Sequence, residues 1–265
     1  MQKLSENFRL AVCRMDVDDL GHAFVAGYRV PDETDPVKRD RYLNISRTSA
    51  FSRQMSLFFK GYINQLMEGL SVAIVYAGGD DVFLVGGWDA VVEAAQRIQD
   101  HFSCYCGGSL TISAGISMHD DHFPIRQAAA VSAELESCAK QQPGKNSVAL
   151  LDESGDHAYS WKIFREKVLQ EKLVCLEKFF GDETQERGNS FLYRLLEFLR
   201  QTEKDKINLA RYAYLLARME PRERNKRDSY REFSRNMYRW GLSAEDRRQL
   251  ITAIYLMVYK ERKGN

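Results

Sequence analysis

The fold is decided by residues 71–85, which read Ser71-Val72-Ala73-Ile74-Val75-Tyr76-Ala77-Gly78-Gly79-Asp80-Asp81-Val82-Phe83-Leu84-Val85. Two apolar, β-rich runs joined by a glycine pair predict a hairpin, because glycine adopts the positive φ that a tight turn requires. Asp80 and Asp81 then lie side by side at its exposed tip. Like charges repel there unless a cation neutralises them, and Mg²⁺ or Mn²⁺ accept carboxylate oxygens while leaving room for phosphate and water. The turn therefore predicts a metal site, and an ordinary solvated turn is the alternative.

A second acidic stretch follows the apolar run near the start of the chain, at residues Leu10-Ala11-Val12-Cys13-Arg14-Met15-Asp16-Val17-Asp18-Asp19-Leu20-Gly21. A strand that ends at Asp16 can lie beside the hairpin and bring a third carboxylate to the same point. Polymerase-type nucleotidyl transfer uses carboxylates from two neighbouring strands to hold two metal ions, which activate a 3′-hydroxyl and stabilise the leaving pyrophosphate. Asp16, Asp80 and Asp81 are thus the predicted metal-binding and catalytic residues. Asp18 and Asp19 could join them or cap the following turn.

The composition is that of a soluble globular protein with ample material for a core, with 44% apolar and 28% charged residues in a chain of 265. The net charge of +1 gives no global field that would attract nucleic acid, so any such surface must be local. The five cysteines are scattered and odd in number, which favours reduced thiols. No apolar run approaches the length of a membrane span, so we expect a cytoplasmic protein without a membrane partner.

Apolar periodicity divides the first part of the chain into strands at 9–16, 71–75, 82–85, 110–116 and 147–151 and helices at 44–68, 88–102 and 124–141. Their order, β-α-β-β-α-β with an extra α-β unit, is the ferredoxin-like plan of one sheet with helices on one face, which polymerase palms and nucleotide cyclases share. From about 159 to 260 we find helical periodicity without a convincing strand, broken by polar loops at 181–188, 220–228 and 241–244. We therefore expect an α+β fold, with a palm domain over 1–152 and a C-terminal bundle of four or five helices over 153–265.

With these pieces in order, the chain resembles the large subunit of type III CRISPR effector complexes, the type III-A form in particular. The resemblance covers most of residues 9–151 and is carried by the stretches 15–21, 46–59, 77–86, 110–116 and 144–147. These proteins are cyclic oligoadenylate synthetases, which implies ATP as substrate, Mg²⁺ or Mn²⁺ as cofactor and a role in antiviral defence. The family's two palm domains hold two ATP molecules between them, and this sequence resembles the second palm followed by the C-terminal helical domain.

The family's first palm, N-terminal nuclease domain and zinc-binding segment have no counterpart in this sequence. We therefore expect the chain to be one part of a larger protein, either cut at the second palm or half of a split protein. The resemblance also implies partners. These are the other subunits of a type III-A effector complex, with the helical domain contacting the small subunits, together with guide and target RNA.

Six further residues are candidates for nucleotide binding. Gly78 and Gly79 allow a phosphate or ribose to approach the backbone where a Cβ would clash. Lys140 and Lys145 lie in a stretch that also resembles the helix-to-strand corner of diguanylate cyclases, where basic residues hold the triphosphate; both could equally be ordinary surface lysines. On the long helix, Ser52 and Arg53 could contact base or ribose, and packing or salt bridging are the alternatives.

Residues 218–239 form a basic segment with interleaved aromatic residues. Its cations are Arg218, Arg222, Arg224, Lys226, Arg227, Arg231, Arg235 and Arg239. Its aromatic residues are Tyr230, Phe233 and Tyr238, and Trp240 follows directly after the segment. Such a surface suits RNA or a protein partner on an RNA filament. Acidic residues such as Glu220 and Glu232 dilute it, so a solvated, salt-bridged helix is the alternative.

Two other functions fit parts of the pattern. A diguanylate cyclase shares the sheet plan, but those enzymes carry glutamate and phenylalanine where this chain has Asp81 and Val82. A non-catalytic docking subunit, which binds nucleotide without converting it, is the third possibility. The complete carboxylate set argues against a decayed site.

Overall fold

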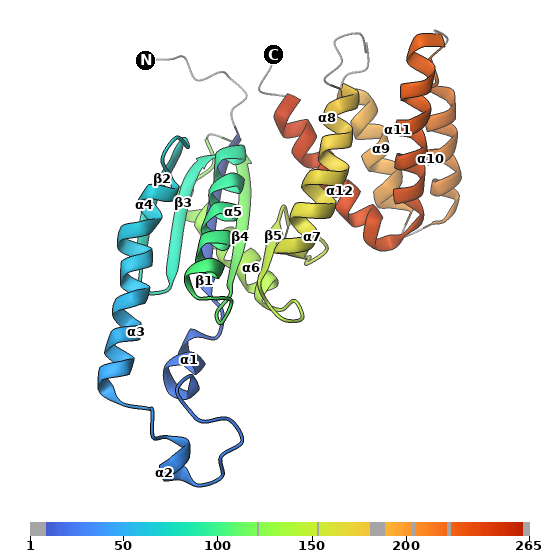
Figure 1. The fold of residues 1–265 in the computed structure, drawn as a ribbon. Helices are drawn as coiled ribbons and strands as arrows, with labels where there is room; N and C mark the ends of the chain where they lie inside the picture. Colours follow the sequence, from blue (N-terminus) through green and yellow to red (C-terminus); the bar gives the residue numbers. More distant parts are fainter. Residues whose placement is uncertain are drawn as a thin grey trace. The chain divides into compact units, whose positions relative to one another are not determined.

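The structure, a computed structural model, describes residues 9–120, 122–152, 154–180, 189–202, 205–221 and 224–261. The chain separates into two compact units, the first comprising Arg9–Trp161 and the second beginning at Lys162. The first is an α/β layer structure and the second is helical, which confirms the predicted fold class (Figure 1).

The first unit is built on a six-stranded sheet in the order β2-β3-β1-β4-β5-β6. Its strands are β1 (Arg9–Val17), β2 (Val72–Gly78), β3 (Asp81–Gly87), β4 (Ile112–Asp120), β5 (Ser147–Leu150) and β6 (Ala158–Ser160). Neighbouring strands are antiparallel except β4 and β5, which are parallel. The central strands β1 and β4 carry mostly buried residues, because both faces of the sheet are covered by helices.

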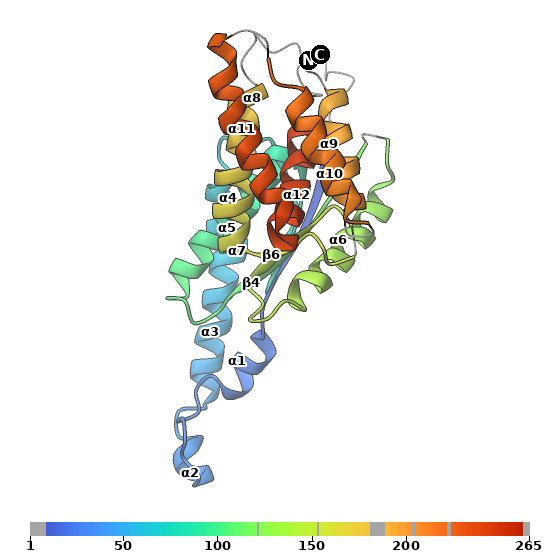
Figure 2. The same cartoon turned by 90° about the vertical axis from the view of Figure 1, so that its right-hand side faces the viewer.

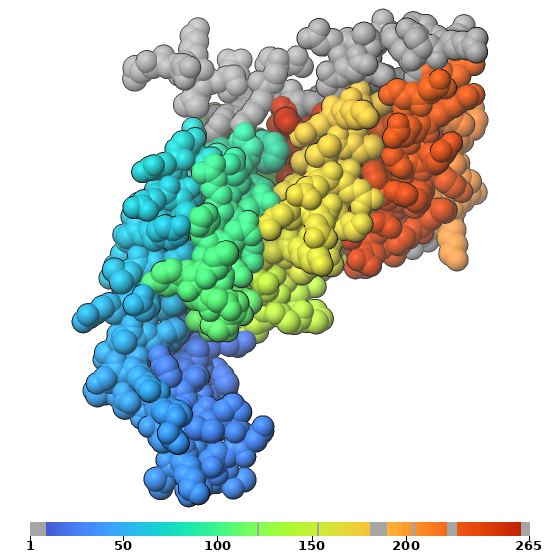
Figure 3. All heavy atoms as spheres, viewed as in Figure 1, coloured from blue at the N-terminus to red at the C-terminus, as the bar shows by residue number. Residues whose placement is uncertain are grey.

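One face is covered by two long helical segments that lie side by side on the sheet (Figures 1 and 3). The predicted long helix comprises α3 (Ile45–Leu57), a π-helical turn η1 (Phe58–Tyr62) and α4 (Ile63–Leu66). It contacts α5 (Trp88–Tyr105) through Phe58 and Phe102, whose ring centroids are 5.2 Å apart. The hydroxyl of Tyr62 also hydrogen-bonds His101 Nδ1 at 2.9 Å. These aromatic contacts explain the phenylalanine-rich helical periodicity of the sequence.

The opposite face is covered by α6 (Ile125–Lys140) (Figure 2). A Cβ added to Gly115 of β4 would lie 2.2 Å from both the Ser132 carbonyl oxygen and the Glu136 amide nitrogen of α6. The absence of a side chain at Gly115 is therefore what lets this helix approach the strand so closely. The expectation of helices on one face only is wrong. The helices of the ferredoxin-like core do lie on one face, but the additional helix α6, which connects the parallel strands β4 and β5, lies on the other.

Three short elements were not predicted. Two lie in the polar stretch after β1, namely α1 (Leu20–Ala26) and α2 (Pro36–Arg39), and the third is β6, which pairs with β5 through Tyr159 and Val148. Each is too short to display a period, so the sequence pattern could not reveal it. Because β6 belongs to the sheet, the first unit continues to Trp161, whose indole Nε1 donates to the Ile112 carbonyl oxygen at 2.9 Å.

The second unit is an all-helical bundle. Its elements are α7 (Trp161–Ile163), whose first residue still belongs to the first unit, the π-helical η2 (Phe164–Leu173), α8 (Val174–Phe180), α9 (Asn189–Gln201), α10 (Ile207–Arg218), α11 (Arg224–Leu242) and α12 (Ala244–Glu261). The first three follow one another without a break, so the described residues of this unit contain five helical segments, within the predicted four or five. The predicted loop at 181–188 lies outside the described residues. The predicted loop at 220–228 is shorter, because α11 already begins at Arg224.

Candidate active site

The structure brings the ends of β1 and of the hairpin together at one edge of the sheet (Figure 1). Asp16 lies directly opposite Asp81 in the antiparallel pairing of β1 with β3, so the two side chains share a face. The hairpin turn consists of Gly79 and Asp80, and Gly79 has a φ of +70°, which confirms the predicted need for glycine. The Asp80 carbonyl oxygen accepts a hydrogen bond of 3.1 Å from the Val17 amide, which joins the turn to β1.

The three carboxylates are electrostatically crowded. Burial raises the pKa of Asp80, and the charges of Asp16 and Asp81 raise it further. The charge of Asp81 also raises the pKa of the nearby Tyr76 hydroxyl, because a neighbouring carboxylate disfavours the negatively charged form of the phenol. A bound cation would remove this repulsion. The residue types and their crowding therefore fit a divalent metal ion.

Lys140, at the end of α6, already places a cation on this cluster. Its ammonium group donates to Asp16 Oδ2 and, at 3.0 Å, to Glu136 Oε1. Burial lowers the pKa of Lys140, but the hydrogen bonds and charges of Asp16 and Glu136 outweigh burial and raise it. Glu136 in turn receives the Arg14 guanidinium at 3.0 Å. In the described part of the chain, no three His, Cys, Asp or Glu side chains converge as a ready metal-ligand set. The set of Asp16, Asp80 and Asp81 therefore stays a prediction.

The two remaining aspartates of the first motif have different surroundings. Asp18 is only 4% exposed, and its Oδ2 accepts hydrogen bonds from Thr111 Oγ1 at 2.7 Å and Ser113 Oγ at 3.1 Å. Asp19 is exposed, has a φ of +54° and receives the Lys145 ammonium. That hydrogen bond is the main cause of a lowered pKa at Asp19. Lys145 therefore lies near the first motif, although it is 129 positions from Asp16 in the chain.

Ser52 and Arg53 are both exposed on α3, a helix that extends beyond the edge of the sheet where the carboxylates lie (Figure 1). No hydrogen bond or ion pair of either side chain is found among the described residues. Their predicted role in nucleotide binding stays a prediction, as do those of Gly78, Gly79, Lys140 and Lys145. Gly78 is buried, and the nearest atoms to a Cβ added there belong to Tyr76 and Lys60.

Three residues of this site were not recognised from the sequence. Glu136 precedes Lys140 by four positions, a spacing that predicts an ion pair on a helix. Arg14 precedes Asp16 by two positions, so the alternation of a strand places both on the face that α6 covers. Lys60, whose Cε lies 3.6 Å from the Cβ position of Gly78, belongs to the π-helical turn, and no sequence pattern indicates it.

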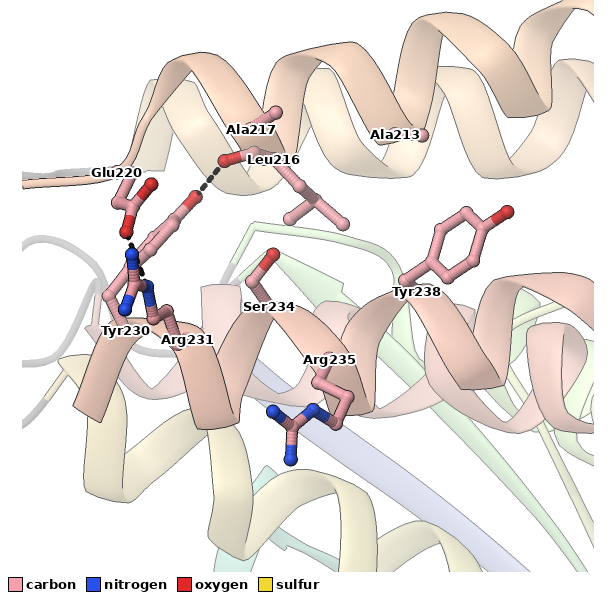
Figure 4. A pocket seen from close by; sticks show the side chains of 9 residues that line it. All are labelled: Ala213, Leu216, Ala217, Glu220, Tyr230, Arg231, Ser234, Arg235 and Tyr238. Atoms are coloured by element: carbon pink, nitrogen blue, oxygen red, sulfur yellow. Dashed lines mark hydrogen bonds and ion pairs between the residues drawn. The ribbon is translucent and has the colours of Figure 1, made fainter. Parts of the chain in front are cut away.

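In the helical unit, the predicted basic surface of residues 218–239 is mostly paired or buried. Arg231 donates to Glu220 at 2.7 Å across a pocket of about 430 Å³ between α10 and α11, where Arg235 points away from α10 (Figure 4). Of the aromatic side chains, Tyr238 is exposed, and the ones buried in the bundle are Tyr230, Phe233 and Trp240. The side chains of Arg222, Arg224 and Lys226 lie outside the described residues. These contacts favour a salt-bridged helix over a stacking surface for bases.

The fold and its carboxylates define the first unit as a palm domain. Residues 9–149 match the family model of the Cas10/Cmr2 second palm domain, and residues 177–263 match that of the second helical domain of the CRISPR RNA silencing complex Cmr2 subunit. The chain therefore belongs to the Cas10/Cmr2 family, as its sequence motifs indicate. In the described residues, no helix is both long enough and apolar enough to cross a membrane.

Two curated relatives are named CRISPR system single-strand-specific deoxyribonuclease Cas10/Csm1 of subtype III-A. The protein of Streptococcus thermophilus is 40% identical over 96% of this chain, and that of Mycobacterium tuberculosis is 37% identical over 96%. These matches span 33% and 32% of the relatives, so the chain covers about a third of their length.

Solved structures of Csm1 share the fold. A Csm1–Csm4 cassette in complex with cA4 superposes with a TM-score of 0.64 at 25% identity, covering 96% of this chain and 37% of that chain. A Csm1–Csm4 cassette in complex with AMPPNP has a TM-score of 0.59 at 29% identity, covering 80% of this chain and 32% of that chain.

Proposed function

We propose that this chain is the second palm and C-terminal helical domain of a type III-A large subunit, and that its palm takes part in converting ATP into cyclic oligoadenylate. The observation that carries the proposal is the pairing of Asp16 with Asp81 across β1 and β3, with Asp80 in the adjoining turn. Two neighbouring strands thereby present carboxylates at one point, as metal-dependent nucleotidyl transfer requires.

In the proposed reaction, the 3′-hydroxyl oxygen of one ATP attacks the α-phosphorus of another. The new 3′–5′ phosphodiester bond forms as the α–β phosphoanhydride bond breaks, pyrophosphate leaves and the hydroxyl proton passes to solvent. Mg²⁺ or Mn²⁺ bound by Asp16, Asp80 and Asp81 would supply the positive charge that stabilises the attacking 3′-oxygen and the leaving pyrophosphate oxygen. Gly78 and Gly79 leave space for phosphate or ribose beside the turn, and Ser52 and Arg53 are candidates to contact base or ribose.

The two lysines would bind the triphosphate. Lys140 and Lys145 are only 27% and 34% exposed and already contact carboxylates of the first motif, Asp16 and Asp19. An incoming triphosphate carries several negative charges, whereas each carboxylate carries one. The triphosphate can therefore replace Asp16 and Asp19 as the partner of the two ammonium groups. The Csm1–Csm4 structures in complex with AMPPNP and with one ATP support ATP as the nucleotide.

The same comparisons support the partners that we propose. The Csm1–Csm4 cassettes support a Csm4-like subunit as one partner. Guide and target RNA are further partners that we propose, since the helical domain matches that of a CRISPR RNA silencing complex subunit. The helical unit would contact the small subunits. Such an assembly would work in the cytoplasm.

Replacing Asp80 and Asp81 together by Asn tests the proposal, because Asn keeps the size of each side chain and removes its charge. In the assembled effector complex, we expect the double variant to lose metal-dependent ATP turnover by at least about a hundredfold, the scale on which single electrostatic contributors to catalysis act. The matched control is Asp120→Asn, which changes a carboxylate at the far end of β4. Product formation by the double variant at the wild-type rate would refute the assignment.

Two alternatives predict different results in binding experiments. A diguanylate-cyclase-like enzyme would bind and convert GTP in preference to ATP. A docking subunit without catalysis would bind ATP and release it unchanged, even when the complex is complete. Incubation of the assembled complex with each labelled nucleotide separates all three.

A further inference from the structure

We propose that Asp18 is a positioning residue, which holds the corner of residues 144–146 and thereby keeps Lys145 directed at the triphosphate. This inference rests on the proposed function, in which Lys145 binds phosphate. Asp18 itself is buried behind the site and would act only through the corner.

Asp18 ties together three segments that are distant in the sequence. Its Oδ2 accepts hydrogen bonds from Thr111, just before β4, and from Ser113, within β4, and also from the backbone amide of Asn146 at 3.0 Å. The Asp18 amide in turn donates to the Thr111 carbonyl oxygen at 2.8 Å. All three hydrogen bonds converge on Oδ2, and they offset part of the hydration that this buried carboxylate has lost.

The corner that Asp18 holds is conformationally costly. Gly144, Lys145 and Asn146 have φ angles of +79°, +51° and +47°, so three consecutive residues adopt the left-handed conformation. Glycine does so freely, but lysine does not, and such a residue persists only where its surroundings enforce it. The Asp18–Asn146 hydrogen bond fixes the amide that immediately follows Lys145.

The corner is also held from other sides. Gln99 of α5 donates to Asn146 Oδ1 at 3.3 Å, and the Trp161 amide donates to the Asn146 carbonyl oxygen at 3.1 Å. These contacts hold Asn146, whereas Asp18, among the residues that the structure describes, links Asn146 to the end of the strand that carries Asp16. Through Asp18, one strand end thus determines the position of both a predicted metal ligand and a predicted phosphate-binding lysine.

The test is a double-mutant cycle with Asp18→Ala and Lys145→Ala in the 265-residue chain, measuring the binding of ATP and of AMP by calorimetry. If Asp18 acts through Lys145, each single variant should weaken ATP binding about tenfold, the factor for one lost charge-assisted hydrogen bond, and should leave AMP binding within about twofold. In the Lys145→Ala background, Asp18→Ala should then add less than about a twofold loss.

Two further variants separate positioning from folding. Asp18→Asn keeps an acceptor oxygen but loses the charge, so its ATP affinity should lie between that of Asp18→Ala and that of the wild type. The matched control Thr111→Val removes a different hydrogen bond of the same carboxylate and should leave ATP affinity nearly unchanged. If Asp18→Ala does not fold, Asp18→Asn still tests the positioning role, because the Asn146 amide reports whether its hydrogen bond to residue 18 has changed. The proton resonance of this amide should move upfield on losing its charged acceptor, and ATP but not AMP affinity should fall with it.

The positioning role would be overturned if the fold-losses in ATP affinity of the two single variants multiplied in the double variant. An equal loss of ATP and AMP affinity would also overturn it. So would an Asp18→Asn protein with an unchanged Asn146 resonance and unchanged ATP affinity. Failure of the proposed function looks different. In that case the wild-type chain would bind no ATP, or Lys145→Ala would bind ATP as the wild type does.

Discussion

At the scale of single residues, the site is a balance between clustered carboxylates and two nearby lysines. Asp16, Asp80 and Asp81 could be selected from the sequence because acidic residues at strand ends and turns have a recognisable pattern. Their partners could not. The contacts of Lys140 with Asp16 and of Lys145 with Asp19 join residues more than a hundred positions apart. Such pairs follow from how α6 and the corner after it pack against the sheet, and not from local spacing.

The raised pKa of Asp80 gives a prediction about stability and pH. In the folded protein Asp80 holds its proton more tightly than at its ordinary pKa of 3.8, so the folded state binds more protons in the interval between the two values. Its ionisation therefore does not affect stability below pH 3.8 and destabilises the metal-free protein as pH rises through the raised pKa.

We expect the thermal midpoint of Asp80→Asn, measured against that of the wild type without metal, to gain steadily over this pH interval and then to level off. Adding Mn²⁺ at neutral pH should stabilise the wild type and have little effect on the variant. A difference in midpoint that does not vary with pH would contradict the electrostatic explanation.

At the scale of elements, α6 organises the site, since it carries Glu136 and Lys140 and packs against β4 and β1. Its existence was predicted from apolar periodicity, but its face of the sheet was not, because periodicity shows which side of a helix is apolar and not which side of a sheet it covers. Periodicity also did not reveal the π-helical turn η1, because its residues continue the apolar period of the longer helix around it.

Gly115→Ala should displace α6, because the new Cβ would meet backbone atoms of this helix at 2.2 Å and backbone cannot yield as a flexible side chain can. We expect a loss of about 3 kcal/mol in the free energy of unfolding, the upper part of the range for overpacked cores, measured by urea denaturation. Gly21→Ala is the matched control, because nothing lies within 4 Å of a Cβ there and the residue is helical. Equal stability of the two variants would show that α6 packs less closely than described.

Lys140 gives a prediction about metal binding. Because its ammonium group occupies Asp16 Oδ2, a metal ion must displace it before using that oxygen. Lys140→Met should therefore bind Mn²⁺ about two- to fivefold more tightly in the absence of nucleotide, the factor for removing a competing ion pair of 0.5–1 kcal/mol, and should bind ATP more weakly. Calorimetric titration measures both. Arg14→Met, which removes a contact to Glu136 and none to Asp16, should leave Mn²⁺ affinity nearly unchanged, and weaker Mn²⁺ binding by Lys140→Met would reverse the inference.

At the scale of the whole molecule, the sequence predicted both the order of the palm and the helical character of the second unit. We place the boundary between the two domains after Trp161, nine residues beyond the predicted end of the palm at 152, because β6 completes the sheet and Trp161 is anchored to Ile112. A strand of three residues, from Ala158 to Ser160, carries too little pattern to move that boundary from sequence alone.

The central claim is that this palm supplies the metal-binding carboxylates and one ATP site, and needs a second palm surface to orient the attacking 3′-hydroxyl. Positioning of this kind can lower a barrier by about 7–11 kcal/mol, so its absence should nearly abolish synthesis. The most direct measurement incubates the chain with labelled ATP and Mn²⁺, with and without the first-palm part of a type III-A large subunit, while light scattering reports oligomeric state. We expect the monomeric chain alone to bind ATP but make almost no oligoadenylate, and the reconstituted pair to make cyclic product. Abundant cyclic product from a verified monomer would contradict the account.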